Sequence, residues 1–214
     1  MASELLRLLE VMDRLRSPGG CPWDAEQTHQ SLIKYLLEES YEFVDAVDAD
    51  DREAMREELG DVLLQVYFHS RIAQDHPTDP FSIEEVAAGI ADKLIRRHPH
   101  VFGEVQAETS DEVLQNWEKL KAAEKNRTSA TDGVALAQPA LPLITKLIYR
   151  AEKSGINLDL PTADMNNEVP AEVAIGDALV AAVAAAIKQG IEPEDLLRTR
   201  AREISEEIKR IESL

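Results

Sequence analysis

Hydrophobic positions recur at helical spacing along nearly the whole chain, and no convincing run alternates with a period of two. The first apolar stripe covers residues 5–16 and ends at the breakers of residues 17–20. The same periodicity predicts further helices at 24–47, 52–73 and 82–97, from 109, at 139–154 and 171–189, and from 193. The pattern therefore predicts an all-α protein. Because connections in the first half are short, its helices are expected to pack as an antiparallel bundle.

Local signals mark several of the predicted helix ends. Asp24 is positioned to cap the helix over 24–47, and residues 98–103 are expected to form a loop. Three later starts carry their own signals, namely the capping boxes Ser82/Glu85 and Thr109/Glu112 and a proline at 193. Residues 127–138, rich in Thr, Ser, Ala and Asp, predict a linker between a domain at 1–126 and a second helical region at 139–214.

Composition limits the partners and the compartment. The chain has 214 residues, with 23 Lys and Arg against 41 Asp and Glu, a formal net charge of −18. This balance argues against nucleic acid as a partner, because such binding depends on Lys and Arg at the phosphates. The longest apolar stretch, 178–187, is too short to cross a membrane. A single cysteine and a charged, helical beginning without a signal peptide predict a cytoplasmic protein.

The candidate chemistry lies in an acidic stretch over residues 38–61, which holds eleven carboxylates and only two basic residues. Two pairs stand out by their three-residue spacing, Glu39/Glu42 in one helix and Glu58/Asp61 in the next. Both pairs alternate with residues expected to face a core, namely Leu36, Tyr41 and Phe43, and Leu59, Val62 and Leu63. Partly buried, unpaired carboxylates are costly, and a hard divalent cation such as Mg²⁺ would remove that cost. A solvated acidic helix face is the alternative that spacing alone leaves open.

Several motifs in register resemble one family. They are Gly20-Cys21-Pro22-Trp23-Asp24, Gln27-Thr28, 37–42 (LEESYE), 57–61 (EELGD), 92–102 (DKLIRRHPHVF) and 117–121 (WEKLK). Together they resemble MazG, within the all-α nucleoside triphosphate pyrophosphohydrolases. The resemblance implies Mg²⁺-dependent hydrolysis of nucleoside triphosphates to the monophosphate and pyrophosphate, with Mn²⁺ as a substitute ion, and a homodimer. It also implies that Glu39, Glu42, Glu58 and Asp61 ligate the metal.

Further candidate residues lie around the carboxylates. Glu38 is a candidate base for the attacking water, with an orienting role as the alternative. Candidate substrate-binding residues are Lys93, Arg96, Arg97, Trp117 and Lys121, which without the resemblance would be surface cations and a core tryptophan. Trp23 is a candidate base-stacking residue, with a plug at the end of the bundle as the alternative.

The second half resembles a degenerate copy of the first. Ile175-Gly176-Asp177 echoes Leu59-Gly60-Asp61, but Ala174 stands where Glu58 would, and a helix with the other carboxylate pair is missing. Residues 139–214 are therefore predicted to be catalytically silent.

Two other classes of function are alternatives. A di-iron carboxylate bundle needs two Glu-x-x-His pairs, and the chain offers only Glu26/His29. A non-catalytic module whose acidic face binds a basic partner predicts no Mg²⁺ dependence.

Overall fold

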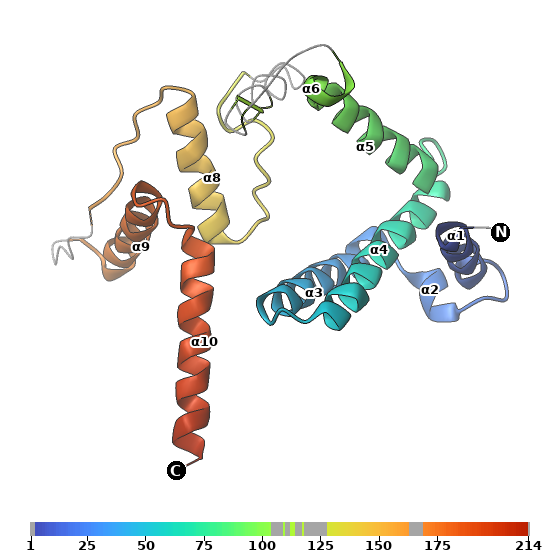
Figure 1. Cartoon of the computed structure of the whole chain (residues 1–214), viewed down its shortest axis with the longest axis horizontal. Coiled ribbons are helices and arrows are strands. Elements are labelled where there is room, and N and C mark those ends of the chain that lie inside the picture. The colour runs from blue at the N-terminus through green and yellow to red at the C-terminus, as the bar shows by residue number, and fades with distance from the viewer. Residues whose placement is uncertain are drawn as a thin grey trace. The chain divides into compact units, whose positions relative to one another are not determined.

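The computed structural model describes residues 3–103, 109, 112–113, 117, 128–162 and 169–213. Every regular element in these ranges is a helix, which confirms the predicted all-α class (Figure 1). The chain divides into two compact units, residues 1–118 and 119–214. None of the described helices is long and apolar enough to cross a bilayer. Lys121 and most of the predicted helix from 109 lie outside the described residues.

The first unit contains six described helices. They are α1 (Glu4–Arg16), α2 (Pro22–Glu26), α3 (His29–Asp48), α4 (Arg52–Gln74), α5 (Ile83–Arg97) and α6 (Pro99–Phe102). The capping box at Ser82 is confirmed, because Glu85 N–H donates to the Ser82 hydroxyl and Ser82 N–H donates to the Glu85 carboxylate. The equivalent pair of bonds joins Thr109 and Glu112.

Two local predictions in this unit were wrong. Asp24 lies inside α2 and does not cap α3. Thr28 takes that place, because Thr28 and Ser31 exchange side-chain-to-backbone hydrogen bonds at the start of α3. The predicted loop at 98–103 contains the short helix α6, which Pro99 begins in the first helical position, where its missing N–H costs nothing.

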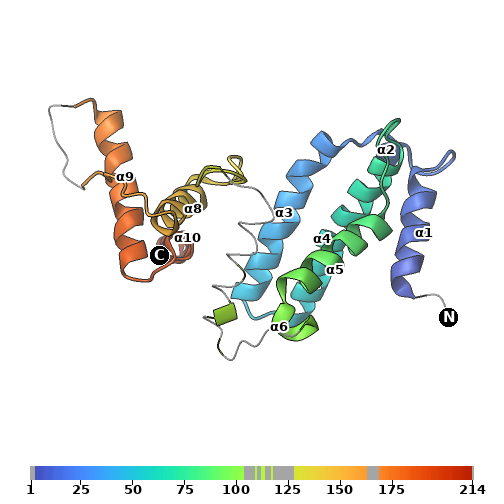
Figure 2. The ribbon, with the colours of Figure 1, turned by 90° about the horizontal axis from the view of Figure 1, so that it is seen from above.

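Helices α3 and α4 form an antiparallel pair that positions the candidate site. Figures 1 and 2 show them side by side along their length, and they make the most extensive helix contact in the described chain. The connection is tight: Asp50 adopts a left-handed conformation (φ 52°), which Asp tolerates better than most residues. Asp51 then accepts hydrogen bonds from Glu53 N–H and Ala54 N–H at the start of α4. The reversal therefore brings the two acidic segments back alongside each other.

The core of the first unit joins α1 to this pair. Met12 from α1, Leu32 from α3, and Tyr67 and Phe68 from α4 are buried against one another. Arg71 of α4 adds a polar link, because its guanidinium donates to Asp13 at 2.9 Å and to Asp75 at 2.7 Å. Helix α1 thus packs across one end of the pair and leaves the acidic segments near the turn outside the core.

The second unit contains α8 (Ala140–Lys153), α9 (Ala171–Lys188) and α10 (Pro193–Glu212). Their boundaries agree with the predicted helices, and Pro193 occupies the first position of α10. Ile148 from α8 packs against Val183 and Ala184 from α9. This core is small because α10 contributes little to it beyond its first turns. Whether the unit is a degenerate repeat of the first stays a prediction.

Candidate functional site

Three carboxylates from α3 and α4 converge near the turn. Each of Glu39, Glu58 and Asp61 offers an oxygen atom, and these atoms all lie within 4.8 Å of one another. All three side chains are half-buried. Because Glu58 and Asp61 are three residues apart on α4, they share a helix face, which here turns toward Glu39 of α3. The antiparallel pairing therefore brings together three of the four residues that the spacing singled out.

Glu42 and Glu38 lie at the margin of this group, and both are exposed. The charge of Glu42 raises the pKa of both Glu39 and Glu58, so its carboxylate lies close to both. It therefore borders the converging oxygens although it lies outside the three-residue group. Glu38 lies in the same turn of α3, with open access to solvent.

The crowding changes the proton affinity of the carboxylates. The pKa of Glu39 is raised, first by burial and then by the charge of Asp61, by the hydrogen bond that Glu39 donates to Glu42 when it is protonated, and by the charges of Glu42 and Glu58. The pKa of Glu58 is raised by burial, by Glu42 and Asp61, and more weakly by Glu57. Each group therefore holds a proton more tightly than an isolated glutamate, and a bound cation would relieve the same repulsion.

The apolar setting predicted for this cluster is only partly present. Leu36, Phe43, Val62 and Leu63 are half-buried, as expected for residues facing the helix pair. Tyr41 and Leu59 were expected to face the core, but they are 51% and 53% exposed. Their side chains therefore face solvent and not the contact between α3 and α4.

The repulsion gives a stability prediction. Glu39→Gln removes one charge from the cluster, so at pH 7.5 with EDTA we expect the melting temperature to rise by about 1–3 °C. The raised pKa of Glu39 gives the direction of the pH dependence. Protonated Glu39 stabilises the folded state below pH 4.5, and this stabilisation is lost as the pH rises through the higher pKa of the folded state. The variant and the parent should therefore converge near pH 4.

The matched control is Glu53→Gln, an exposed residue in the first turn of the same helix pair. It removes the same charge outside the cluster and should give no rise, because a carboxylate favours that helix end. Scanning calorimetry with and without EDTA measures both variants. A melting temperature that falls in Glu39→Gln would contradict the repulsive cluster.

The candidate cations lie on a different helix. Lys93 and Arg97 are one turn apart on α5, which packs on α4. Lys93 is half-buried, Arg96 is exposed and Arg97 is 7% exposed. The burial of Arg97 was not predicted from the sequence. The candidate cations thus lie on one helix, α5, and the three carboxylates lie on α3 and α4.

The two candidate tryptophans occupy exposed positions. Trp23 is 50% exposed and packs edge-on against Tyr35, with ring centroids 5.9 Å apart. About half of its surface is therefore covered, and the rest is open to solvent. Trp117 is 36% exposed, and its ring lies 6.4 Å from that of His98.

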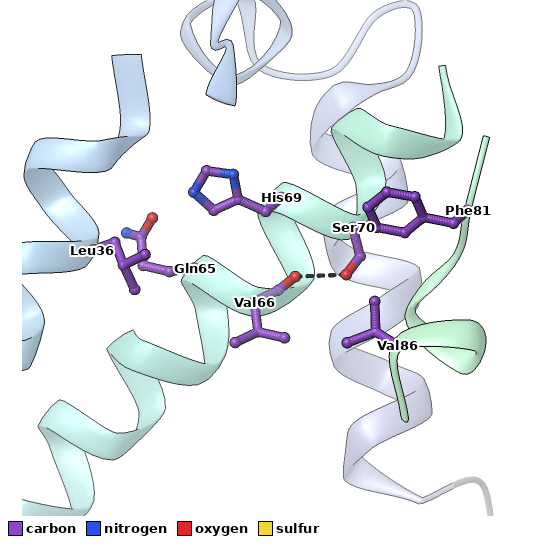
Figure 3. Close-up of a pocket in the computed structure, with 7 residues that line it drawn as sticks. All are labelled: Leu36, Gln65, Val66, His69, Ser70, Phe81 and Val86. Atoms are coloured by element: carbon purple, nitrogen blue, oxygen red, sulfur yellow. Dashed lines mark hydrogen bonds between the residues drawn. The ribbon is translucent and has the colours of Figure 1, made fainter. Parts of the chain in front are cut away.

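Sequence reasoning missed a cavity one helical turn from the carboxylates. It has a volume of about 230 Å³ and is lined by Leu36, Gln65, Val66, His69, Ser70, Phe81 and Val86 (Figure 3). Gln65 follows Asp61 by four residues and Leu36 precedes Glu39 by three. Helical spacing therefore places each of them on the same helix face as a carboxylate, and this part of the cavity could have been predicted from the sequence. The walls are mainly apolar, and the Ser70 hydroxyl is occupied by donating to the Val66 carbonyl oxygen at 2.8 Å.

A histidine pair beside this cavity was also missed. The rings of His29 and His69 stack with an interplanar angle of 2°, and their Nδ1 atoms are 2.8 Å apart. One Nδ1 must donate and the other accept, so the pair cannot be doubly protonated without losing this bond. The pKa of His69 is lowered, first by burial and then by the charge of His29. The two residues are forty positions apart, and nothing in the sequence marks them as partners.

Comparisons with known proteins agree with this architecture. Residues 27–102 match the MazG nucleotide pyrophosphohydrolase domain. An uncharacterized 26.1 kDa protein of Streptomyces cacaoi is 48% identical over 93% of this chain and 78% of its own length. A nucleoside triphosphate pyrophosphohydrolase/pyrophosphatase MazG of Thermotoga maritima is 36% identical over 97% of this chain and 85% of its own.

Other relatives are longer. The nucleoside triphosphate pyrophosphohydrolase of Mycobacterium tuberculosis is 48% identical over 71% of this chain, which spans only 46% of that protein. The matched domain covers α3 to α6 and includes the carboxylate cluster. By its similarity along nearly the full length of the Thermotoga protein, the chain belongs to the MazG family of nucleotide pyrophosphohydrolases.

Proposed function

We propose that the first unit hydrolyses nucleoside triphosphates to the nucleoside monophosphate and pyrophosphate, using Mg²⁺ held by Glu39, Glu42, Glu58 and Asp61. The observation that carries this proposal is the convergence of Glu39, Glu58 and Asp61 from two helices. Carboxylate oxygens are the donors that Mg²⁺ prefers, and the raised pKa values of Glu39 and Glu58 express a repulsion that a cation relieves. The names of the relatives support the same activity.

The proposed reaction is attack of water on the α-phosphorus. A P–O bond forms to the water oxygen, the bond to the bridging oxygen of the β-phosphate breaks, and pyrophosphate leaves. Bound Mg²⁺ would stabilise the negative charge that shifts among the phosphate oxygens as the bond to pyrophosphate breaks. Glu38 is proposed to accept the proton of the water, because its exposed carboxylate is next to Glu39 in sequence. An orienting role is the alternative for Glu38.

The remaining candidate residues are proposed to bind the rest of the nucleotide. Lys93, Arg96 and Arg97, with Lys121, offset the negative charge of the triphosphate, which one Mg²⁺ among four carboxylates cannot do alone. Trp23 and Trp117 offer exposed aromatic faces for the base. The apolar cavity beside Gln65 gives an uncharged ring a second place to bind.

The proposal predicts both a product and a metal requirement. Incubation of the chain with each NTP and Mg²⁺ should release pyrophosphate, detected by orthophosphate that appears only after inorganic pyrophosphatase is added. EDTA should abolish turnover, and Mg²⁺ or Mn²⁺ in excess should restore it, because the triphosphate would otherwise meet only carboxylates in the cluster. Direct release of orthophosphate would mean cleavage at the γ-phosphate. Lack of any metal dependence would favour the acidic interaction module instead.

A homodimer is part of the proposal, and α3 carries a surface that suits it. Ile33, Leu37 and Tyr41 recur every four residues along one face of α3, and each is at least half exposed. Such an apolar stripe on a surface helix is typical of a face that packs against another element. Leu37→Glu is expected to lower the average mass in sedimentation or light scattering. Leu5→Glu, at a leucine of similar exposure on α1, is the control and should leave the mass unchanged.

A further inference from the structure

Helix α10 is exposed over most of its length. It contacts α8 and α9 through its first turns, where Pro193 is buried and Glu194 and Arg198 are half-buried. All residues from 199 to 213 are exposed, and Figure 1 shows α10 extending well past α8 and α9. Packing within its own unit therefore does not explain why this segment is helical and amphipathic.

The apolar residues of this segment form a single seam. They are Leu197, Ala201, Ile204, Ile208 and Ile211, separated by four, three, four and three residues. The three isoleucines and Leu197 are each more than half exposed. This is the 3.5-residue period of a coiled coil, in which such positions face a partner helix. The seam therefore predicts a helical partner.

The charged residues beside the seam favour one orientation of that partner, antiparallel over parallel. In an antiparallel pair of α10 helices, Leu197 lies opposite Ile208 of the second copy, and Ala201 opposite Ile204. Arg200 then lies opposite Glu207 of the second copy, and the two-fold axis repeats this pair. A parallel pair would instead set Glu207 beside Glu212, and an antiparallel shift by one heptad would set Glu207 against itself. Only the first arrangement gives opposite charges without a like-charge contact.

The contacts already present on α10 are compatible with this register. Arg200 pairs with Glu203, and Glu207 accepts from Arg210 at 2.6 Å, but all four side chains are exposed. Exposed pairs of this kind contribute little, so they leave Arg200 and Glu207 able to pair across the seam. Ile211 would lie at the edge of the contact, near Glu194, whose carboxylate is held by Arg198 at 3.3 Å.

We propose that α10 self-associates as an antiparallel two-helix coiled coil with α10 of a second copy of this chain. The second copy is the occupant because the same helix supplies both the apolar seam and the complementary charges. The interface shares no residue with the stripe on α3 or with the carboxylate cluster. Its test is therefore independent of the proposed activity.

The test is sedimentation of the full chain over a range of concentrations, in the Leu37→Glu background that removes the α3 stripe. Because α10 adds a second contact, the parent chain should associate beyond the α3 dimer, and this variant should still form dimers through α10. Arg200→Glu and Glu207→Arg should each raise the dimer dissociation constant by about tenfold or more, because each places like charges opposite one another. The double variant Arg200→Glu/Glu207→Arg should restore association, which also shows that the helix tolerates both changes.

Other results would overturn the proposal. Tighter association of Glu207→Arg would indicate a parallel pair. Single charge reversals without effect, or a double variant that still associates weakly, would exclude the charge pairing. Ile208→Glu is expected to abolish the remaining association, and association that survives this change would exclude the apolar seam. A chain that is already monomeric in the Leu37→Glu background, at every concentration, would show that the seam is covered within one chain or left open.

Discussion

Asp61→Asn is expected to lower the rate of pyrophosphate release by about a hundredfold or more. The substitution keeps the shape of the side chain but removes one of three converging negative charges. Removing residues that only orient a ligand already costs 10–100-fold in many metal sites, so loss of a proposed ligand should cost at least as much. Release of pyrophosphate under saturating Mg²⁺ and NTP measures the effect.

The chain supplies its own matched control for this variant. Asp177 follows a glycine on α9 as Asp61 does on α4, and it is half-buried in the same way. Among the residues that the structure describes, Asp177 is not part of a carboxylate group able to hold a metal. Asp177→Asn should therefore leave turnover unchanged. A comparable loss in both variants would mean that the second unit takes part in the reaction, and full activity of Asp61→Asn would refute the site.

Met12→Ala is expected to destabilise the first unit by about 2–5 kcal/mol, the usual cost of truncating a fully buried large side chain. Met12 is 1% exposed and lies between Leu32, Tyr67 and Phe68, so its loss leaves a cavity that joins three helices. Because the same cluster fixes α3 and α4, turnover should also fall at temperatures where the unit begins to open. Chemical denaturation followed by far-UV circular dichroism measures the change.

Val11→Ala is the control for this prediction. Val11 is the preceding residue on α1 and is 46% exposed, so its truncation should change the free energy of unfolding by less than about 0.5 kcal/mol. Equal losses in both variants would mean that α1 is not seated on α3 and α4 through Met12.

The part of the site that could be predicted from the sequence is the part governed by helical spacing. Three-residue spacing put Glu58 and Asp61 on one face, and the short Asp50–Asp51 reversal returned them to the level of Glu39. Spacing could not fix the burial of Arg97, because that depends on what the end of α5 packs against. It equally could not pair His29 with His69, since their contact depends on the relative rotation of two helices.

The errors in the fold have a similar origin. Tyr41 and Leu59 were assigned to a core because apolar residues near buried positions usually face one. In the described chain they are exposed, since residues next to each other on a helix point in different directions and these two face solvent. Asp24 was a reasonable cap by residue type, but Thr28 and Ser31 satisfy each other's backbone groups four residues later.

The tight reversal between α3 and α4 also bears on how the protein folds. All four proposed ligands lie within one helical hairpin, and only twenty-two positions separate the first from the last. Loop closure over so short a distance is entropically cheap, and contacts of this kind form early in folding. The proposed cation ligands would therefore be brought together by one local helical hairpin and not by contacts between distant segments of the chain. Amide hydrogen exchange should slow first in this hairpin when Mg²⁺ is added.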